Sequence, residues 1–183
     1  MSETAVENQL EVKFSREFCM PDEATFSMRP VAALLERWLP KGMTLIVDPF
    51  ARNSTWGTCT NDLNPRTKAS LHLPAEEFLA NFNQKRFAHA VLFDPPYSPR
   101  QIAECYRIAK KKAQMVDTQN AKLCKVVKDG LDRILAPGGI AICCGWNSSG
   151  FGKVRGYELL EILLVQHGGA HNDTIVTVER KGG

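Results

Sequence analysis

Two short apolar segments of this sequence each run directly into an aspartate followed by a proline. Residues 43–47 lead into Asp48-Pro49, and residues 88–93 lead into Asp94-Pro95. Continuous apolar runs of this length are typical of strands buried on both faces, as in a parallel sheet covered by helices. Because ligands bind beyond the carboxyl ends of such strands, we expect both aspartates to lie at one edge of a sheet, beside a ligand site.

Further patterns predict helices and strands in alternation around these two segments. Apolar residues recur at helical spacing over 30–39, 75–82 and 100–134, the last with a break expected near Thr118. More strands are predicted at 58–61, 71–73, 140–144, 161–166 and 174–179, the last two joined as a hairpin. The sequence therefore predicts an α/β fold with a mostly parallel seven-stranded sheet and one antiparallel strand from the C-terminal hairpin.

Length and composition indicate one globular domain. A chain of 183 residues with 44% hydrophobic content can bury a core of its own. Residues 1–20 are polar and weakly patterned, so we expect a flexible segment whose last part packs down, and a single domain over 21–183. No stretch approaches the roughly 18 apolar residues of a membrane span, and the start lacks a signal-peptide pattern. We expect a soluble, cytoplasmic protein without a membrane partner.

The cysteines, histidines and charges exclude some kinds of site. The six cysteines show no CxxC spacing and the four histidines are scattered, so no metal site is expected. A net charge of +3 is compatible with a polyanionic partner without requiring one. The basic residues gather at Lys110-Lys111-Lys112 and at Lys153 and Arg155, which are candidate contacts to phosphates or simply solvated surface.

The segment Asp94-Pro95-Pro96-Tyr97 resembles the catalytic motif of the amino-methyltransferases that modify adenine or cytosine in nucleic acids. The exocyclic amine of a base is a poor nucleophile because its lone pair is delocalised into the ring. The resemblance implies that the Asp94 carboxylate and the carbonyl between the two prolines accept the amine hydrogens. Proline fixes these acceptors in place, and Tyr97 offers a face for a base taken out of its stack.

Segments upstream resemble the part of this family that binds the methyl donor S-adenosylmethionine. Asp48-Pro49-Phe50-Ala51 matches the start of the motif Asp-x-Phe-x-Gly-x-Gly, although both usual glycines are absent and the next one is Gly57. Asp62-Leu63 matches the acidic position whose carboxylate accepts the ribose hydroxyls. An aspartate in this context can also form an Asx turn or cap a helix.

Three further donor contacts follow from the same resemblance. Met28, ahead of the first helix, lies where the family closes over the methionine moiety, and Ala75 and Glu76 lie where it contacts the adenine ring. Asp94 is assigned to the donor site as well as to catalysis. A plain capped helix is the alternative for the segment around Met28.

The Gly-rich segment after the strand at 140–144 resembles a loop of small phage-type methyltransferases. Trp146 and Phe151 offer stacking faces, and the segment also offers polar or cationic contacts to nucleic acid from Asn147, Lys153 and Arg155. An ordinary crossover loop is the alternative. The resemblance covers about 25–180 and leaves no room for a separate target-recognition domain.

Together these resemblances imply a Rossmann-like class I methyltransferase that methylates the amino group of adenine in DNA, and the resemblance to phage-type enzymes implies a phage origin. Cytosine in DNA, adenine in RNA and a protein glutamine remain alternative targets. A non-catalytic nucleic-acid-binding relic is the alternative from another class, suggested by the missing glycines. These alternatives differ in whether the chain binds the donor and in which base carries the product methyl group.

Overall fold

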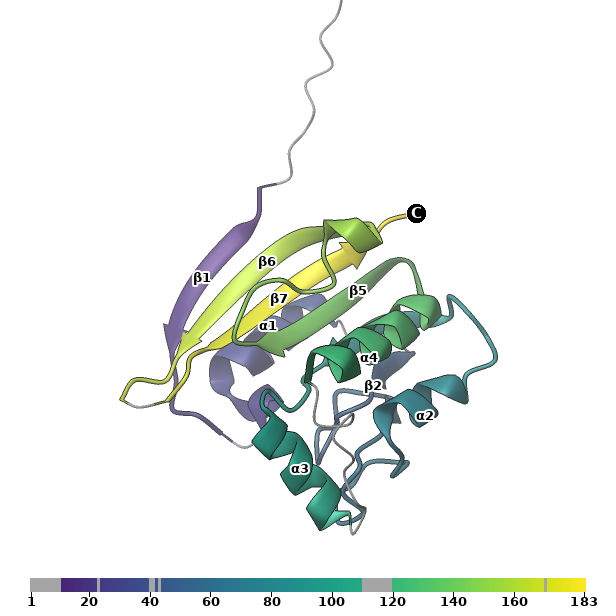
Figure 1. Cartoon of the computed structure of the whole chain (residues 1–183). Coiled ribbons are helices and arrows are strands. Elements are labelled where there is room, and N and C mark those ends of the chain that lie inside the picture. The colour runs from purple at the N-terminus through teal and green to yellow at the C-terminus, as the bar shows by residue number, and fades with distance from the viewer. Residues whose placement is uncertain (1–10, 23, 40–41, 43, 110–119, 170) are drawn as a thin grey trace, which may run out of the picture.

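The computed structural model of the protein describes residues 11–183 apart from 23, 40–41, 43, 110–119 and 170. A seven-stranded sheet in the order β1-β6-β7-β5-β4-β2-β3 forms its centre (Figure 1). The strands are β1 (Lys13–Phe18), β2 (Ile46–Asp48), β3 (Cys59–Thr60), β4 (Ala88–Phe93), β5 (Leu135–Gly145), β6 (Tyr157–Gln166) and β7 (Thr174–Lys181). Among them only β7 runs antiparallel, against both β5 and β6. The predicted α/β fold with a mostly parallel seven-stranded sheet and one antiparallel strand is confirmed.

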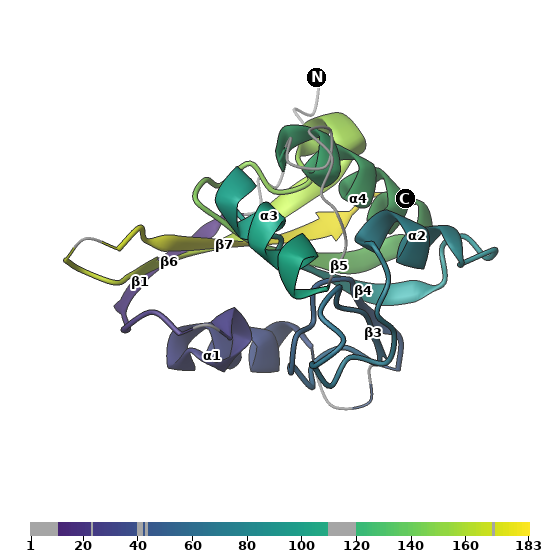
Figure 2. The ribbon, with the colours of Figure 1, turned by 60° about the horizontal axis from the view of Figure 1, so that its bottom comes forward.

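Helices cover both faces of this sheet. Figure 2 shows α1 (Arg29–Trp38) on one face, and α2 (Ala75–Ala80) and α4 (Asn120–Ile134) on the other. Helix α3 (Pro99–Ile108) follows the carboxyl end of β4. Two 3-10 turns, η1 (Thr25–Ser27) and η2 (Lys153–Arg155), precede α1 and β6. None of the helices in the described ranges is long and apolar enough to cross a lipid bilayer.

The helices form where apolar residues recur on one side. In α1, Val31, Leu34 and Leu35 are fully buried and pack against the sheet, and Pro30 stands in the first turn, where its missing N–H costs no helical bond. On the other face, Val127 and Leu131 of α4 are fully buried against β4 and β5. The sheet is therefore the shared layer of two separate cores.

The first strand of the sheet was not predicted. Residues 13–18 form β1, which pairs in parallel with β6 from Lys13 opposite Glu161 to Phe18 opposite Gln166. The polar, weakly patterned sequence of residues 1–20 predicts a flexible terminus instead, and in the structure most side chains of β1 are exposed. This strand forms because its backbone pairs with the edge strand β6, and such pairing needs no alternation of apolar and polar residues in the strand itself.

Other boundaries differ where pairing competes with local pattern. The strand predicted at 71–73 is reduced to one bridge between Leu71 and Asn61. Strand β5 begins at Leu135, five residues before the predicted start, because Leu135 pairs with Ala88 ahead of the irregular Pro-Gly-Gly step. The predicted helical region 100–134 contains α3 and α4, and Thr118 lies outside the described residues.

The order of the strands creates one place where the chain reverses direction across the sheet. From β2 the chain moves outward to β3 and then returns to β4 on the other side of β2. Loops leaving β2 and β4 consequently separate at the carboxyl edge. Open α/β sheets bind ligands in the crevice formed at such a switch point.

Candidate functional site

Three carboxylates lie at this switch point. Asp48 ends β2, Asp62 follows β3, and Asp94 follows β4. Burial raises the pKa of Asp48 to about 8, and the negative charges of Asp94 and Asp62 add to the effect. The carboxyl edge of the sheet is therefore an acidic crevice that favours a positively charged ligand.

Asp48 has an unsatisfied oxygen. The side chain is fully buried, and its Oδ1 accepts the N–H of Phe50 at 3.0 Å. Within the described residues no donor reaches Oδ2, which is itself buried. Since a buried acceptor without a partner costs free energy, this atom marks a position where a ligand can donate a hydrogen bond.

Gly57 makes room for Asp48. A Cβ at Gly57 would lie 2.9 Å from Asp48 Cβ and 2.9 Å from Thr60 Cγ2. Any larger residue would push the start of β3 away from the end of β2. The sequence analysis noted Gly57 only as a late glycine, whereas the structure shows it as the close-approach residue beneath Asp48.

The loop after β2 has a residue with left-handed backbone conformation at the position of the first glycine in the motif Asp-x-Phe-x-Gly-x-Gly. Arg52 occupies that position with φ +50°, a conformation that costs a non-glycine residue about 1 kcal/mol. Its N–H donates to Asp62 Oδ2 at 3.0 Å, and the N–H of Ala51 donates to the Asn61 carbonyl at 2.8 Å. These bonds hold the loop against the segment after β3 despite the missing glycines.

Asp62 is fixed by two backbone donors. Besides the Arg52 N–H, its carboxylate accepts the N–H of Asn64 at 2.8 Å, so the Asx turn considered from sequence is present. Burial raises the pKa of Asp62, and the two backbone bonds and the positive charge of Arg52 oppose that rise. The turn holds the half-buried carboxylate at the wall of a cleft.

This cleft brings together most of the residues assigned to the donor. It contains about 460 Å³ of space between protein atoms, part of it open to solvent. Seven of the residues singled out from sequence line it: Pro49, Phe50, Asp62, Leu63, Ala75, Glu76 and Pro96. Glu76 Oε2 is buried there without a hydrogen-bond partner within the described residues, like Asp48 Oδ2. The cleft therefore offers apolar walls and one buried acceptor that needs a donor, Glu76 Oε2, whereas Asp48 is fully buried and does not line it.

The structure adds lining residues that sequence reasoning missed. Leu73 and Pro74 come from the segment before α2, Ile102, Cys105 and Tyr106 from α3, and Leu123 from α4. Ile102, Cys105 and Tyr106 recur at i, i+3 and i+4, so the spacing of one α3 face was the available signal. Four residues that the sequence analysis assigned to the donor do not line this cleft: Met28, Asp48, Ala51 and Asp94.

Of the Asp94-Pro95-Pro96-Tyr97 segment, which follows β4, only Pro96 lines the cleft. The Tyr97 hydroxyl donates to Asp94 Oδ1, and Ser98 caps α3 through a reciprocal capping box with Gln101. Burial raises the pKa of Asp94, while the hydrogen bonds from Tyr97 and Thr25 oppose the rise. Asp94 is thus held between the sheet and Tyr97 as a proton acceptor.

Trp146 lies beside Tyr97. Their ring centroids are 5.5 Å apart at an interplanar angle of 41°, and Trp146 is 47% exposed. Asn147, the next residue, accepts the N–H of Ser149 at 3.0 Å and closes a turn. The two aromatic rings therefore form an accessible apolar platform next to Asp94.

Lys153 and Arg155 lie at the opposite edge of the sheet. Both belong to η2, directly before Tyr157, the first residue of β6, whose partner is Lys181 at the end of β7. A ten-residue strand spans roughly 30 Å, which separates η2 from the carboxyl edge. Arg155 also pairs with Asp129 at 2.6 Å. The structure does not bring these two cations together with Asp94, and Lys110-Lys111-Lys112 lie outside the described residues.

The segment between Trp146 and η2 is anchored in the protein. Phe151 is 3% exposed and stacks on Tyr157 at 4.8 Å. Glu179 accepts the N–H groups of Phe151 and Gly152 at 2.5 and 2.8 Å, and a Cβ at Gly150 would overlap its carboxylate. Phe151 is consequently part of the core and offers no stacking face to a ligand.

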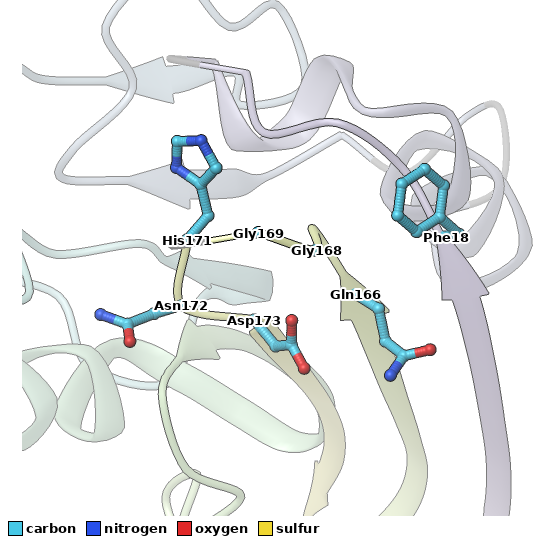
Figure 3. A pocket seen from close by; sticks show the side chains of 7 residues that line it. All are labelled: Phe18, Gln166, Gly168, Gly169, His171, Asn172 and Asp173. Atoms are coloured by element: carbon cyan, nitrogen blue, oxygen red, sulfur yellow. The ribbon is translucent and has the colours of Figure 1, made fainter.

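A larger hollow lies at the β6–β7 hairpin, on the far side of β7 from the acidic crevice. Figure 3 shows its lining side chains, which come from the hairpin and the end of β1: Phe18, Gln166, Gly168, Gly169, His171, Asn172 and Asp173. None of the residues assigned to donor, catalysis or substrate lines it. The smaller cleft beside Asp62 is the better candidate because Asp62 and the buried Glu76 carboxylate, one oxygen of which has no partner among the described residues, line it together with Pro96.

No family model matches the chain, and no curated protein is significantly similar to it. The functional interpretation therefore rests on the residues and geometry of the crevice.

Proposed function

We propose that this protein is an S-adenosylmethionine-dependent methyltransferase with a Rossmann-like class I fold, and that it methylates the exocyclic amino group of adenine in DNA. One observation carries the proposal: Phe50, Asp62 and Glu76 share a single cleft with Pro96 of the Asp-Pro-Pro-Tyr segment. A donor-binding cleft and a group that activates an amine are thereby continuous at the switch point of the sheet.

The charge and hydrogen bonding of the cleft fit this donor. Its sulfonium and ammonium groups are positive, whereas the crevice gathers the carboxyls of Asp48, Asp62 and Asp94. The orphan oxygens of Asp48 and Glu76 match the N–H and O–H donors of the amino acid and nucleoside parts. Phe50 and Leu63 add apolar wall for the adenine ring. When bound, the donor supplies an electrophilic methyl group.

The chain's own residues would prepare the amine. The Asp94 carboxylate and the Pro95 carbonyl accept its two hydrogens and favour a pyramidal nitrogen. The Tyr97 hydroxyl now occupies Asp94 Oδ1, so the amine must replace that bond as it enters. A raised pKa makes the ionised Asp94 a stronger acceptor for the proton that the nitrogen loses.

Tyr97 and Trp146 would hold the base. Their adjacent faces and the exposure of Trp146 provide a stacking surface, worth about 1–3 kcal/mol per stacked base. Moving a base onto these rings costs least when the base is already unstacked, so single-stranded or flexible DNA is the favoured substrate.

Incubation with methyl-labelled donor and single-stranded DNA, duplex DNA or RNA, followed by digestion to nucleosides, tests this function. We expect label on the amino nitrogen of adenine in DNA, and no label with the Asp94→Ala variant. Label on cytosine or in RNA would replace the proposed substrate. Absence of donor binding in calorimetry, with no label in any substrate, would instead identify a non-catalytic module.

A further inference from the structure

Among the described residues, no strand pairs with the outer side of β1. The N–H of Cys19 donates to the Gln166 carbonyl at 3.0 Å, so odd-numbered residues of this segment direct their backbone groups toward β6. Even-numbered residues, among them Phe14, Arg16 and Phe18, direct theirs outward. In the part of the chain that the structure describes, β1 is the last strand of the sheet. An exposed edge of this kind is a template for another strand.

The same even-numbered residues form an apolar stripe. Val12, Phe14 and Phe18 are 40%, 65% and 62% exposed, and Phe14 lies beside the half-buried Ile162 of β6. Helix α1 covers the other face, where Lys13 pairs with the buried Glu161 at 3.3 Å. In Figure 1 no labelled helix covers the β1–β6 end on the side of α4. Apolar side chains therefore flank the free edge on an open face.

We propose that β1 pairs in antiparallel orientation with β1 of a second copy of this chain, about a twofold axis through Ser15. In this register Lys13 lies opposite Glu17 of the partner subunit, and the pair occurs twice. Phe14 lies opposite the partner's Arg16, which allows a cation–π contact. Val12 lies opposite the partner's Phe18. Charge and apolar surface are thus both self-complementary.

Symmetry limits the alternatives. A twofold axis perpendicular to the sheet keeps each side chain on its face, so every allowed register centres on one residue facing itself. Centring on Lys13, Arg16 or Glu17 would place that charge against its own copy. Centring on Phe14 would place Glu11 opposite the partner's Glu17. Among the six residues of β1, Ser15 is the one centre that joins unlike charges within the strand and opposes no like ones.

The assembly would extend the sheet across two molecules while leaving the acidic crevices apart. Because the two β1 strands run in opposite directions, the carboxyl edges of the two sheets face opposite ways. The pairing therefore does not depend on the proposed methyltransferase function, and its test needs no activity.

Cysteine crosslinking tests the register. Ser15 would form a non-hydrogen-bonded pair with its copy, with Cα atoms about 4.5 Å apart, within the range that a disulfide spans. We expect Ser15→Cys to form a covalent dimer under mild oxidation. The Arg16→Cys variant and the wild-type chain, which has six cysteines of its own, should not. Crosslinking of Arg16→Cys without Ser15→Cys would overturn the register.

Sedimentation velocity tests the association itself. The wild-type protein should have twice the 20.4 kDa mass of the chain. Glu17→Lys would place a lysine against the partner's Lys13 and should weaken the dimer at least tenfold, while Glu77→Lys, an exposed change on α2, should not. A monomeric wild-type protein at about 100 μM, or a dimer equally stable in both variants, would overturn the proposal.

Discussion

Replacing Asp48 by asparagine tests the acidic crevice most directly. The buried carboxyl has a pKa of about 8, so in the free protein about one molecule in ten has it ionised at pH 7 and about one in a hundred at pH 6. If a cationic donor binds beside the ionised form, binding must release the proton. The apparent Kd of the donor should therefore fall about tenfold per pH unit between pH 6 and 8 and level off above pH 8.

The Asp48→Asn variant should lose this pH dependence, because the amide does not titrate and carries no charge. Its Phe50 N–H keeps an acceptor, so the loop should stay in place. Titration calorimetry between pH 6 and 9, in buffers with different ionisation enthalpies, measures both the affinity and the proton released. The exposed Asp22→Asn change is the matched control. A wild-type affinity that is flat over this range, or an equal slope in Asp48→Asn, would refute the reasoning.

The stability of the free protein gives a second readout of the same carboxyl. The pKa of Asp48 is raised in the folded state from an ordinary value of 3.8, so the folded protein binds more protons than the unfolded chain between about pH 4 and 8. The free energy of unfolding should consequently decline by up to about 1.4 kcal/mol per pH unit as the pH rises through this window. Urea denaturation should show that Asp48→Asn lacks this part of the decline.

Substitutions at four other residues separate the roles of those residues. Asp94→Ala removes a hydrogen-bond acceptor aimed at the amine, so it should lower kcat about 100- to 1,000-fold and leave the calorimetric Kd of the donor nearly unchanged. Near-normal turnover of this variant would show that Asp94 has no catalytic role. Tyr97→Phe keeps the aromatic ring and removes the hydrogen bond to Asp94 Oδ1, so the KM for nucleic acid should stay equal or fall. Tyr97→Ala removes the ring and should raise this KM about 10- to 100-fold. Equal effects of the two variants on KM would exclude stacking on Tyr97. Arg52→Gly removes the cost of the left-handed φ of +50°, so urea denaturation should show a free energy of unfolding about 1 kcal/mol higher. A lower free energy of unfolding would mean that the Arg52 side chain stabilises the fold. Burial opposes ionisation of Glu161, but the bonds from Trp38 and Arg37 outweigh burial and hold the pKa of Glu161 below the ordinary 4.5. Glu161→Gln should therefore lower the free energy of unfolding by about 2 kcal/mol at pH 7, and this loss should vanish as the pH falls well below 4. A loss of stability that does not depend on pH would contradict the ionic role.

Local patterns in the sequence were sufficient for the central part of the fold. The apolar run before Asp94 is strand β4, and the helical spacing after Pro30 is α1. These elements are buried on the faces that their patterns indicate, so periodicity alone locates them. Strand β1 and the early start of β5 were missed because both depend on pairing with a distant strand, at Glu161 and at Ala88.

The candidate site divides in the same way. The sequence by itself determined which carboxyls follow the strands, since Asp48 and Asp94 stand directly after apolar runs whose period is local. Only the tertiary structure decided that Glu76 shares a cleft with Pro96, that Gly57 packs beneath Asp48, and that Arg155 lies at the other edge of the sheet. The separation of two residues along the chain does not predict their distance across the sheet. That distance depends on the order and direction of the strands, which backbone pairing and the burial of both sheet faces determine together.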